Sequence, residues 1–498
     1  MAPHAVSDPD LKDATSVTVQ QLTDEWRLAN PDLLLADPAT KEHCRRHNSQ
    51  ALCIQNPRVA LTGSRSRPSM KRRLIFLDGL RGIAALQIVF LHYASAFIPA
   101  IGLLDVSLVR HTWERHFIAS PLFFLFDGYL SVYLFFLISG SVLTYSFSVR
   151  PFALFSGLSR RLVRLGLPMT ASVLLSVVLL ALMPTAHFEA GRLSGSAHWL
   201  AVISPPVICL QTILREIFLS GMLAGHVGDT ILPDAWTSAL QLTPASQSFN
   251  SPLWTLHWEF FGSLIVLMLV AIRARYGKLV HLVMSTIALW LLGAQPLGLF
   301  VVGHLMAPLP LSPPWQVFAR HWSGRLLAVI FIAFGMATSA HSQRSIPHFF
   351  QWMQNVLLLR RLDDFHIYGL TGAVLIFVGV MASPQLWKFL STPPLKWLGQ
   401  MSFSIYLTHF AVLITLASGV FVLTQPLLYS TVIASVVGIG LSIGFAIAFE
   451  RYVDRPAIRL SRRLGLHNSD HENGVTLDNQ PDVGCNGRVR IASDLRSP

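Results

Sequence analysis

The apolar residues of this chain fall in long runs that are rarely interrupted by charge. A hydrocarbon core about 30 Å thick is crossed by about 20 residues of helix. Runs of this kind favour helices surrounded by lipid over amphipathic helices or alternating strands. We therefore predict an all-α fold, a polytopic membrane helical bundle of about ten transmembrane helices. The expected spans are residues 82–103, 127–147, 167–184, 252–272, 279–292, 297–309, 326–340, 368–382, 403–422 and 429–449.

Polar segments at both ends divide the chain into three parts. Residues 1–70 predict a soluble cytosolic extension that is partly disordered, with an amphipathic helical pattern over residues 17–34. Residues 71–463 form the expected transmembrane domain, and residues 464–498 predict a disordered cytosolic tail. The apolar stretch 201–219 is interrupted by prolines and an arginine, so we expect it to be re-entrant or interfacial.

Basic residues gather beside the ends of the apolar runs. The positive-inside rule places such residues in the cytosol. If both termini are cytosolic the number of spans is even, which favours ten over nine. Three arginines of one loop would lie on the opposite side. The residues that follow the rule are Lys71, Arg72, Arg73, Arg150, Arg160, Arg161, Arg164, Arg273, Arg275, Lys278, Arg451, Arg455, Arg459, Arg462 and Arg463, and those that do not are Arg344, Arg360 and Arg361.

Composition supports a membrane protein and argues against two other classes. Only 13% of the residues are charged and the mean hydropathy is +0.51, whereas soluble domains carry about 25% charged residues. The net charge of +12 lies at span ends rather than on a soluble face, so we expect no nucleic-acid partner. The four cysteines form no CxxC or Cys/His cluster, so we expect neither a disulfide framework nor a metal.

Two ionisable residues of the first span, Arg81 and His92, are eleven positions apart. On a helix they differ by roughly 20° in direction and by about 16 Å along the axis, so we expect both to face a common cavity. An arginine at the lipid boundary can hold a phosphate, and a histidine near the midplane can act as a general base. The alternative is that His92 packs within the bundle and that Arg81 extends to the membrane surface.

Five stretches resemble, in order, the motifs of the acyltransferase 3 family of integral membrane acyltransferases. The first contains Arg81 and His92, and the second, ending in Ser139 and Gly140, matches the family's FFxISG signature. The third is a basic helix entry, the fourth a Trp/Glu helix, and the fifth a late-helix signature that ends at His409. The five stretches are residues 76–93, 132–140, 160–168, 251–261 and 397–409.

The resemblance implies that His92 is the catalytic base and that Arg81 helps to bind an acyl-CoA co-substrate. Arg161 and Arg164 share a helical face and are expected to contact coenzyme A phosphates, unless they serve only to set topology. Ser139 is expected to contact the donor. The alternative for the Ser-Gly pair is that its small side chains allow two helices to approach closely.

Glu259 is the most deeply placed acid of the expected spans and lies beside His257. It is a second candidate catalytic residue, because a carboxylate can orient a catalytic imidazole or receive an acceptor hydroxyl. A structural ion pair with one of the arginines is the alternative. Near the fifth motif's end, Tyr406 and His409 are interpreted as core-packing residues.

The resemblance also implies the activity. It is closest to fungal members that acylate secondary metabolites, which implies an O-acetyltransferase acting on a hydroxyl of a small lipophilic metabolite such as a terpenoid or polyketide. The donor is expected to be acetyl-CoA or another acyl-CoA, the acceptor to arrive from the cytosol or the membrane plane, and the location to be the endoplasmic reticulum or another endomembrane. Transfer is either direct or through an acyl-histidine. The alternatives are a proton-coupled small-molecule transporter, which the absence of an inverted repeat disfavours, and an inactive scaffold.

Overall fold

The computed structural model describes residues 74–148, 154–293, 295–340, 364–425 and 429–473. Two compact units divide at Arg67 and Pro68, and every described residue belongs to the second unit. Within the described residues the chain is helical, and its one extended pairing is an isolated bridge between His226 and Asp229. The all-α membrane fold is thereby confirmed. The expected N-terminal extension with its amphipathic pattern lies outside the described residues, and so do Arg344, Arg360 and Arg361, the arginines that do not follow the positive-inside rule.

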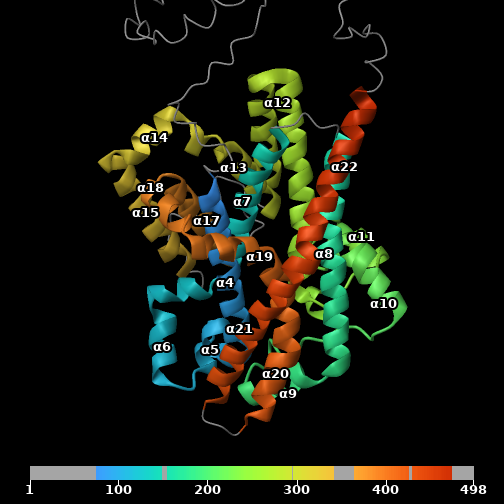
Figure 1. Ribbon diagram of the computed structural model, residues 1–498. Helices are drawn as coiled ribbons and strands as arrows, with labels where there is room; N and C mark the ends of the chain where they lie inside the picture. Colours follow the sequence, from blue (N-terminus) through green and yellow to red (C-terminus); the bar gives the residue numbers. More distant parts are fainter. Residues whose placement is uncertain (1–73, 149–153, 294, 341–363, 426–428, 474–498) are drawn as a thin grey trace, which may run out of the picture. The chain divides into compact units, whose positions relative to one another are not determined.

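The helices follow one another without sheets between them (Figure 1). Helix α22 continues past the expected tail boundary at residue 463. The α-helices are α4 (Ile75–Phe97), α5 (Pro99–Gly102), α6 (Thr112–Ala119), α7 (Gly128–Ser148), α8 (Leu154–Leu182), α9 (Ala186–Ser194), α10 (Leu210–Arg215), α11 (Asp234–Ala239), α12 (Trp254–Leu292), α13 (Pro296–Met306), α14 (Pro313–Arg320), α15 (Trp322–Ala340), α17 (Asp364–Met381), α18 (Pro384–Leu390), α19 (Pro393–Val412), α20 (Ser418–Leu423), α21 (Ser430–Phe449) and α22 (Arg455–Asn473). Three π-helical turns are η4 (Glu216–Ala224), η8 (Leu413–Ala417) and η9 (Glu450–Asp454).

Six helices of the described part are long and apolar enough to cross a membrane, or up to eight if two bent pairs count as one span each. The bent pairs break by 79° after α13 and by 96° after α17. The number is lower than ten partly because Ser251–Leu292, where two spans were expected, counts as one helix, and partly because other expected spans form shorter pieces, such as the apolar part of α15 (Trp322–Thr338). The six are Ile75–Phe97, Gly128–Ser148, Ser156–Leu182, Ser251–Leu292, Pro393–Leu423 and Ser430–Leu464.

Helix α12 is two helical arms joined at Gly277. This glycine has φ 82° and ψ −173°, which is far from helical geometry, and only glycine adopts such a conformation readily. The chain turns back there, so that the second arm runs beside the first (Figure 1). His281 of the second arm contacts His304 of α13. The separate spans expected before and after this glycine therefore correspond to the two arms.

Helices α4 and α19 pack backbone against backbone. A Cβ on Gly82 would lie 2.6 Å from the amide nitrogen of Gly399, and a Cβ on Gly399 would lie 2.1 Å from the carbonyl oxygen of Asp78. Further along, His92 of α4 contacts His409 of α19, so the two helices run in the same direction. Glycines allow this approach because any larger side chain would separate the helices.

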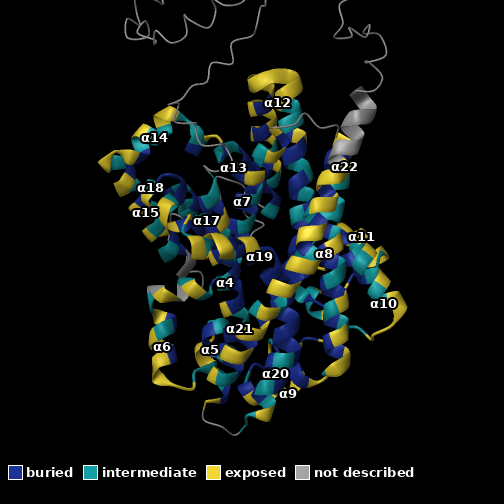
Figure 2. Cartoon of the chain, viewed as in Figure 1, coloured by how far each residue is buried: buried dark blue, intermediate teal, exposed yellow. Residues whose placement is uncertain are grey.

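Exposed and buried positions alternate along the helices of the bundle (Figure 2); many of the exposed residues are large and apolar, and several of the buried ones are small or polar. Val436 of α21 and Val178 of α8 are 66% and 57% exposed. Inside, the Ser172 hydroxyl donates to the carbonyl oxygen of Leu407 and receives a hydrogen bond from Asn250. This distribution is the one expected of helices whose outer solvent is lipid.

Ser139 and Gly140, the small residues that end the second motif, face different sides of α7. A Cβ on Gly140 would lie 2.3 Å from the carbonyl oxygen of Phe300 in α13, so close approach of α7 and α13 requires glycine. Ser139, the preceding residue, faces a cavity on another side of α7. The close-approach interpretation therefore holds for Gly140, and Ser139 remains available to a ligand.

Candidate active site

The first cavity of the site has a volume of about 220 Å³ and lies where α4 begins. Its charged lining comes from three helices, α4, α8 and α12, and α7 and α19 contribute uncharged side chains. Apolar and aromatic side chains complete the walls. The polar and charged lining residues are Asp78, Arg81, Ser139, Arg161, Arg164, Thr255, Glu259 and Tyr406.

Three guanidinium groups meet in this cavity, and two of them have carboxylate partners. Arg161 Nη2 lies 2.8 Å from Glu259 Oε1, with side chains only 12% and 16% exposed. Arg164 forms an ion pair with Asp454. Arg81 stands over the ring of Phe135, and among the described residues its Nε has no hydrogen-bond partner. Arg81 therefore has unused capacity to bind an anion in this cavity.

The second cavity has a volume of about 320 Å³ and contains His92. Helix α4 contributes one wall, and the long connection between α9 and α12 contributes another, through residues 199–203, 229 and 245–252. The lining is mostly aromatic and aliphatic, with a carboxylate and two serines among it. The lining residues from outside α4 include Tyr129, Trp199, Asp229, Ser246, Ser251, Trp254 and Phe410.

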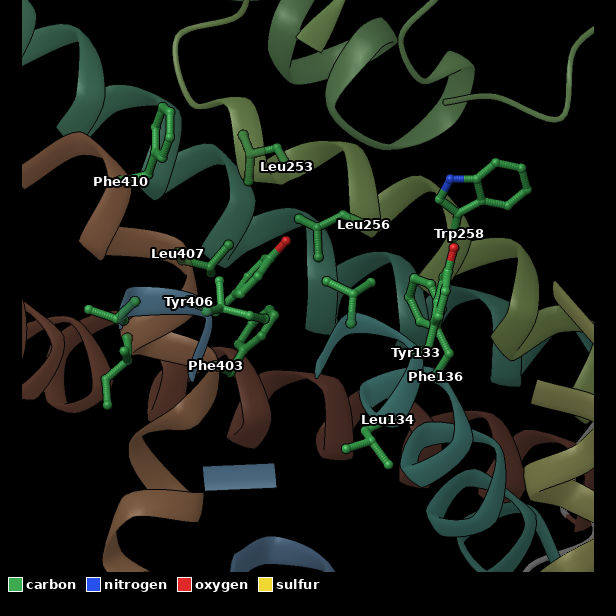
Figure 3. Packing of buried hydrophobic residues seen from close by; sticks show 14 of the residues in the cluster. Tyr133, Leu134, Phe136, Leu253, Leu256, Trp258, Phe403, Tyr406, Leu407 and Phe410 are labelled. Carbon is green, nitrogen blue, oxygen red and sulfur yellow. The ribbon is translucent and has the colours of Figure 1, made fainter. Parts of the chain in front are cut away.

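The two cavities adjoin at Val132 and Tyr406, which line both of them. Tyr406 is held in place because its hydroxyl donates to the carbonyl oxygen of Pro252 at 2.7 Å and lies 2.7 Å from Thr255 Oγ1. Figure 3 shows Tyr406 in the packed core near Leu407 and Phe403. The expectation that Arg81 and His92 face a common cavity is thus replaced by two cavities with a shared boundary.

The imidazole of His92 is paired with a second imidazole. His92 Nδ1 lies 2.8 Å from His409 Nε2, and the ring planes are inclined by only 9° with centroids 5.1 Å apart, so the two rings lie edge to edge in nearly one plane. Trp199 stacks on His92 at 5.7 Å, and Phe410 meets its edge at 5.3 Å. His409, interpreted from the sequence as a packing residue, is therefore the direct hydrogen-bonding partner of the candidate base.

Glu259 lies in the first cavity with Arg161, whereas His92 lines the second. The structure thus shows the ion pair that was the alternative for Glu259. Its neighbour His257 is also fully occupied, because Nδ1 lies 3.0 Å from the Met222 carbonyl oxygen and Nε2 accepts from the Ile231 amide at 3.0 Å. His257 therefore fixes the connection between α9 and α12 to α12.

Several residues of the His92 cavity had no assigned role from the sequence. Asp229, Trp199 and Trp254 reach it from a connection and a helix start whose placement no periodicity reveals. His409 had one signal, since it ends a recognised motif, but it is 317 residues from His92. Among the described residues, no group of three or more His, Cys, Asp or Glu side chains is arranged to hold a metal ion.

Comparisons of the sequence with known proteins identify the family of this chain. The acyltransferase 3 profile, described as an acyltransferase domain, matches residues 74–451. This match covers more than half of the chain and includes both cavities. Searches of curated proteins and of solved structures found no match. The chain belongs to the acyltransferase 3 family of integral membrane acyltransferases.

Proposed function

We propose that the protein is an O-acyltransferase that moves an acetyl group from acetyl-CoA to a hydroxyl of a small lipophilic metabolite such as a terpenoid or polyketide. One observation carries the proposal: a cavity with three guanidinium groups adjoins a cavity with an imidazole, and Val132 and Tyr406 line both. A polyanionic donor and an apolar acceptor would need such neighbouring environments. Membership of the family supplies acyl transfer as the reaction.

The first cavity suits one end of the donor. Ligand sites usually measure about 300–1,000 Å³, so a cavity of about 220 Å³ holds the acyl group and part of the pantetheine arm rather than the whole molecule. The phosphates then lie toward the arginines, where charge-assisted hydrogen bonds are strong. Within the described part of the chain, Arg81 and Arg161 each have an unsatisfied guanidinium nitrogen, and we take Arg81 as the first contact because Arg161 is already paired with Glu259. Arg161, Arg164 and Ser139 complete the donor site.

The second cavity suits an acceptor with an apolar body. Two tryptophans and a phenylalanine wall it, and polar groups are few, which is the usual composition of a site for a small lipophilic ligand. His92 lies toward the end of α4 that is remote from Arg81, and the connection between α9 and α12 covers this side. We therefore place acceptor entry at the end of the bundle where α4 ends, rather than on the donor side.

The proposed reaction is a direct displacement. His92 removes the proton of the acceptor hydroxyl while its oxygen attacks the thioester carbonyl. The new C–O bond forms, the C–S bond breaks, and the sulfur of coenzyme A receives the proton from His92. The acyl group crosses the boundary at Val132 and Tyr406. We place the donor side in the cytosol because basic residues gather at that end of the spans. We also propose that the protein lies in the endoplasmic reticulum or another endomembrane.

The test uses membranes that contain the full chain, radiolabelled acetyl-CoA and a panel of hydroxylated terpenoids and polyketides. His92→Ala should lower kcat by about 10²-fold or more, with the KM for acetyl-CoA unchanged. Arg81→Ala should raise that KM by about tenfold, the loss of one hydrogen bond to a charged group. His116→Ala and Arg115→Ala, exposed on α6, are matched controls. Full transfer by His92→Ala would refute the proposed chemistry.

A further inference from the structure

We infer that His409 is a positioning residue that fixes the tautomer of His92. Through this contact His92 carries its proton on Nδ1 and presents an unprotonated Nε2 to the second cavity. The inference rests on the proposed function, because it concerns how the candidate base is prepared. It depends on which atom donates in two hydrogen bonds, one between His409 and the carbonyl oxygen of Ile405 and one between His92 and His409.

The direction of the chain of hydrogen bonds begins at a backbone carbonyl. His409 Nδ1 lies 2.9 Å from the carbonyl oxygen of Ile405. A carbonyl oxygen only accepts, so Nδ1 of His409 carries the proton. In a neutral imidazole the other nitrogen is then an acceptor. His409 Nε2 therefore accepts from His92 Nδ1, 2.8 Å away, and neutral His92 has its lone pair on Nε2.

The neutral form of His409 follows from its surroundings. His409 is 0% exposed, and its described contacts are the Ile405 carbonyl, the His92 ring and the aromatic rings of Tyr406 and Phe410. A buried cation requires a paired charge, and none of these groups is a carboxylate. A charged His409 would also repel the imidazolium that His92 becomes during transfer.

The arrangement prepares His92 for proton transfer in two ways. Among the described residues, Nδ1 makes the hydrogen bond of His92, which leaves Nε2 for a ligand in the cavity that His92 lines. Stacking by Trp199 and the hydrogen bond to His409 together hold the plane of the ring. When Nε2 takes the hydroxyl proton, the Nδ1–H bond to His409 strengthens because its donor becomes charged. A neutral imidazole here takes the orienting place that a carboxylate occupies in hydrolase triads.

A second histidine pair in the protein supplies a matched control. His281 Nε2 lies 2.7 Å from His304 Nε2, and His304 Nδ1 lies 2.7 Å from Thr144 Oγ1. This pair joins α12 and α13 to α7, and none of its members lines either cavity. Loss of its hydrogen bond should therefore alter stability without altering the chemical step.

The first experiment measures transfer from radiolabelled acetyl-CoA by folded protein in membranes. His409→Leu should lower kcat by about 10–100-fold, as loss of an orienting partner does elsewhere, without a change in the KM for acetyl-CoA. His409→Gln keeps an oxygen that can accept from His92 Nδ1 and should restore most of kcat. His304→Leu should lower the melting temperature while kcat per folded molecule stays unchanged. Equal kcat in wild type and His409→Leu would overturn the inference.

The second experiment reads the tautomer without any substrate. Protein labelled with ¹³C and ¹⁵N in histidine is placed in liposomes, and the His92 signals are identified by their loss in His92→Ala. Carbon–nitrogen correlations should show a protonated Nδ1 in wild type and His409→Gln, and a protonated Nε2 in His409→Leu. A protonated Nε2 in wild type would refute the inference, whereas an active His92→Ala would refute the proposed function itself.

Discussion

The ion pair between Arg161 and Glu259 provides a sharp test of what the first cavity requires. Its oxygen and nitrogen are 2.8 Å apart, and both side chains are more than four-fifths buried. Removing one partner of a buried pair leaves an uncompensated charge and costs about 3–5 kcal/mol. We expect a cost of about 3 kcal/mol, the lower bound, for Glu259→Gln because neither side chain is fully buried, and a smaller cost for Arg161→Met.

The two substitutions should not be equivalent. Glu259→Gln leaves the Arg161 guanidinium beside Arg81 and Arg164, and an arginine cannot lose its proton. Arg161→Met leaves a carboxylate, which can take up a proton and so reduce its own cost. Glu259→Gln should therefore be the less stable variant. The double variant removes both charges and should be more stable than either single variant, with a coupling energy of at least about 2 kcal/mol.

The assay is thermal unfolding in detergent, followed by tryptophan fluorescence, for wild type, both single variants and the double variant. Kinetics in membranes give the functional counterpart: kcat of the double variant should stay near wild type, while the KM for acetyl-CoA rises with the loss of Arg161. A coupling energy near zero would show that the pair contributes nothing to the fold. A kcat loss of about 10²-fold in Glu259→Gln without any change in stability would assign Glu259 to the chemical step.

Two further predictions concern the cavity boundary and a buried acid. Val132→Phe places bulk beside Tyr406 and should lower transfer by about 10²-fold through misplacement of the acyl group, with radiolabelled acetyl-CoA binding unchanged; lipid-facing Val178→Phe is the control, and lost binding would contradict the reasoning. Burial raises the pKa of Glu216 from an ordinary 4.5 to about 7, so native protein keeps a proton that unfolded protein releases, and stability falls by about 3 kcal/mol as pH rises from about 4.5 to 7. His226 lies beside Glu216 and is present in both proteins, so its titration cancels when the two are compared. The melting temperature of Glu216→Gln should therefore rise relative to that of wild type between pH 4.5 and pH 8. Melting temperatures that differ by the same amount at every pH would refute this.

The sequence was most informative where one helix holds the relevant residues. The spacing of Arg81 and His92 predicted one common cavity, whereas the two residues line adjoining cavities; their placement along one side of α4 could be predicted because the geometry of a single helix is known in advance. It did not predict that Tyr406 would stand at a boundary between them, since this residue comes from a helix far along the chain. Helical periodicity describes one element, whereas cavities are made by the packing of several.

The same limit explains why the sequence did not reveal the partners of Glu259 and His409. Glu259 had two interpretations, and only the arrival of α8 beside α12 shows the pair with Arg161. His409 was assigned to packing because its neighbours along the chain are apolar, and its contact with His92 depends on the register of α4 against α19. The span count suffered from a related limit, because hydropathy does not reveal where a helix such as α13 bends into α14.

The glycine contacts between α4 and α19 determine which parts of the bundle are able to move. Besides the contacts of Gly82 and Gly399, a Cβ on Gly79 would lie 2.0 Å from the carbonyl oxygen of Leu390, the last residue of α18, just before α19 begins. With main chains this close, one helix cannot slide past the other without steric overlap. The His92–His409 contact is thus carried on a rigid pair. Any opening that admits a ligand to the two cavities must therefore come from the surrounding helices, while the register of His92 against His409 is preserved.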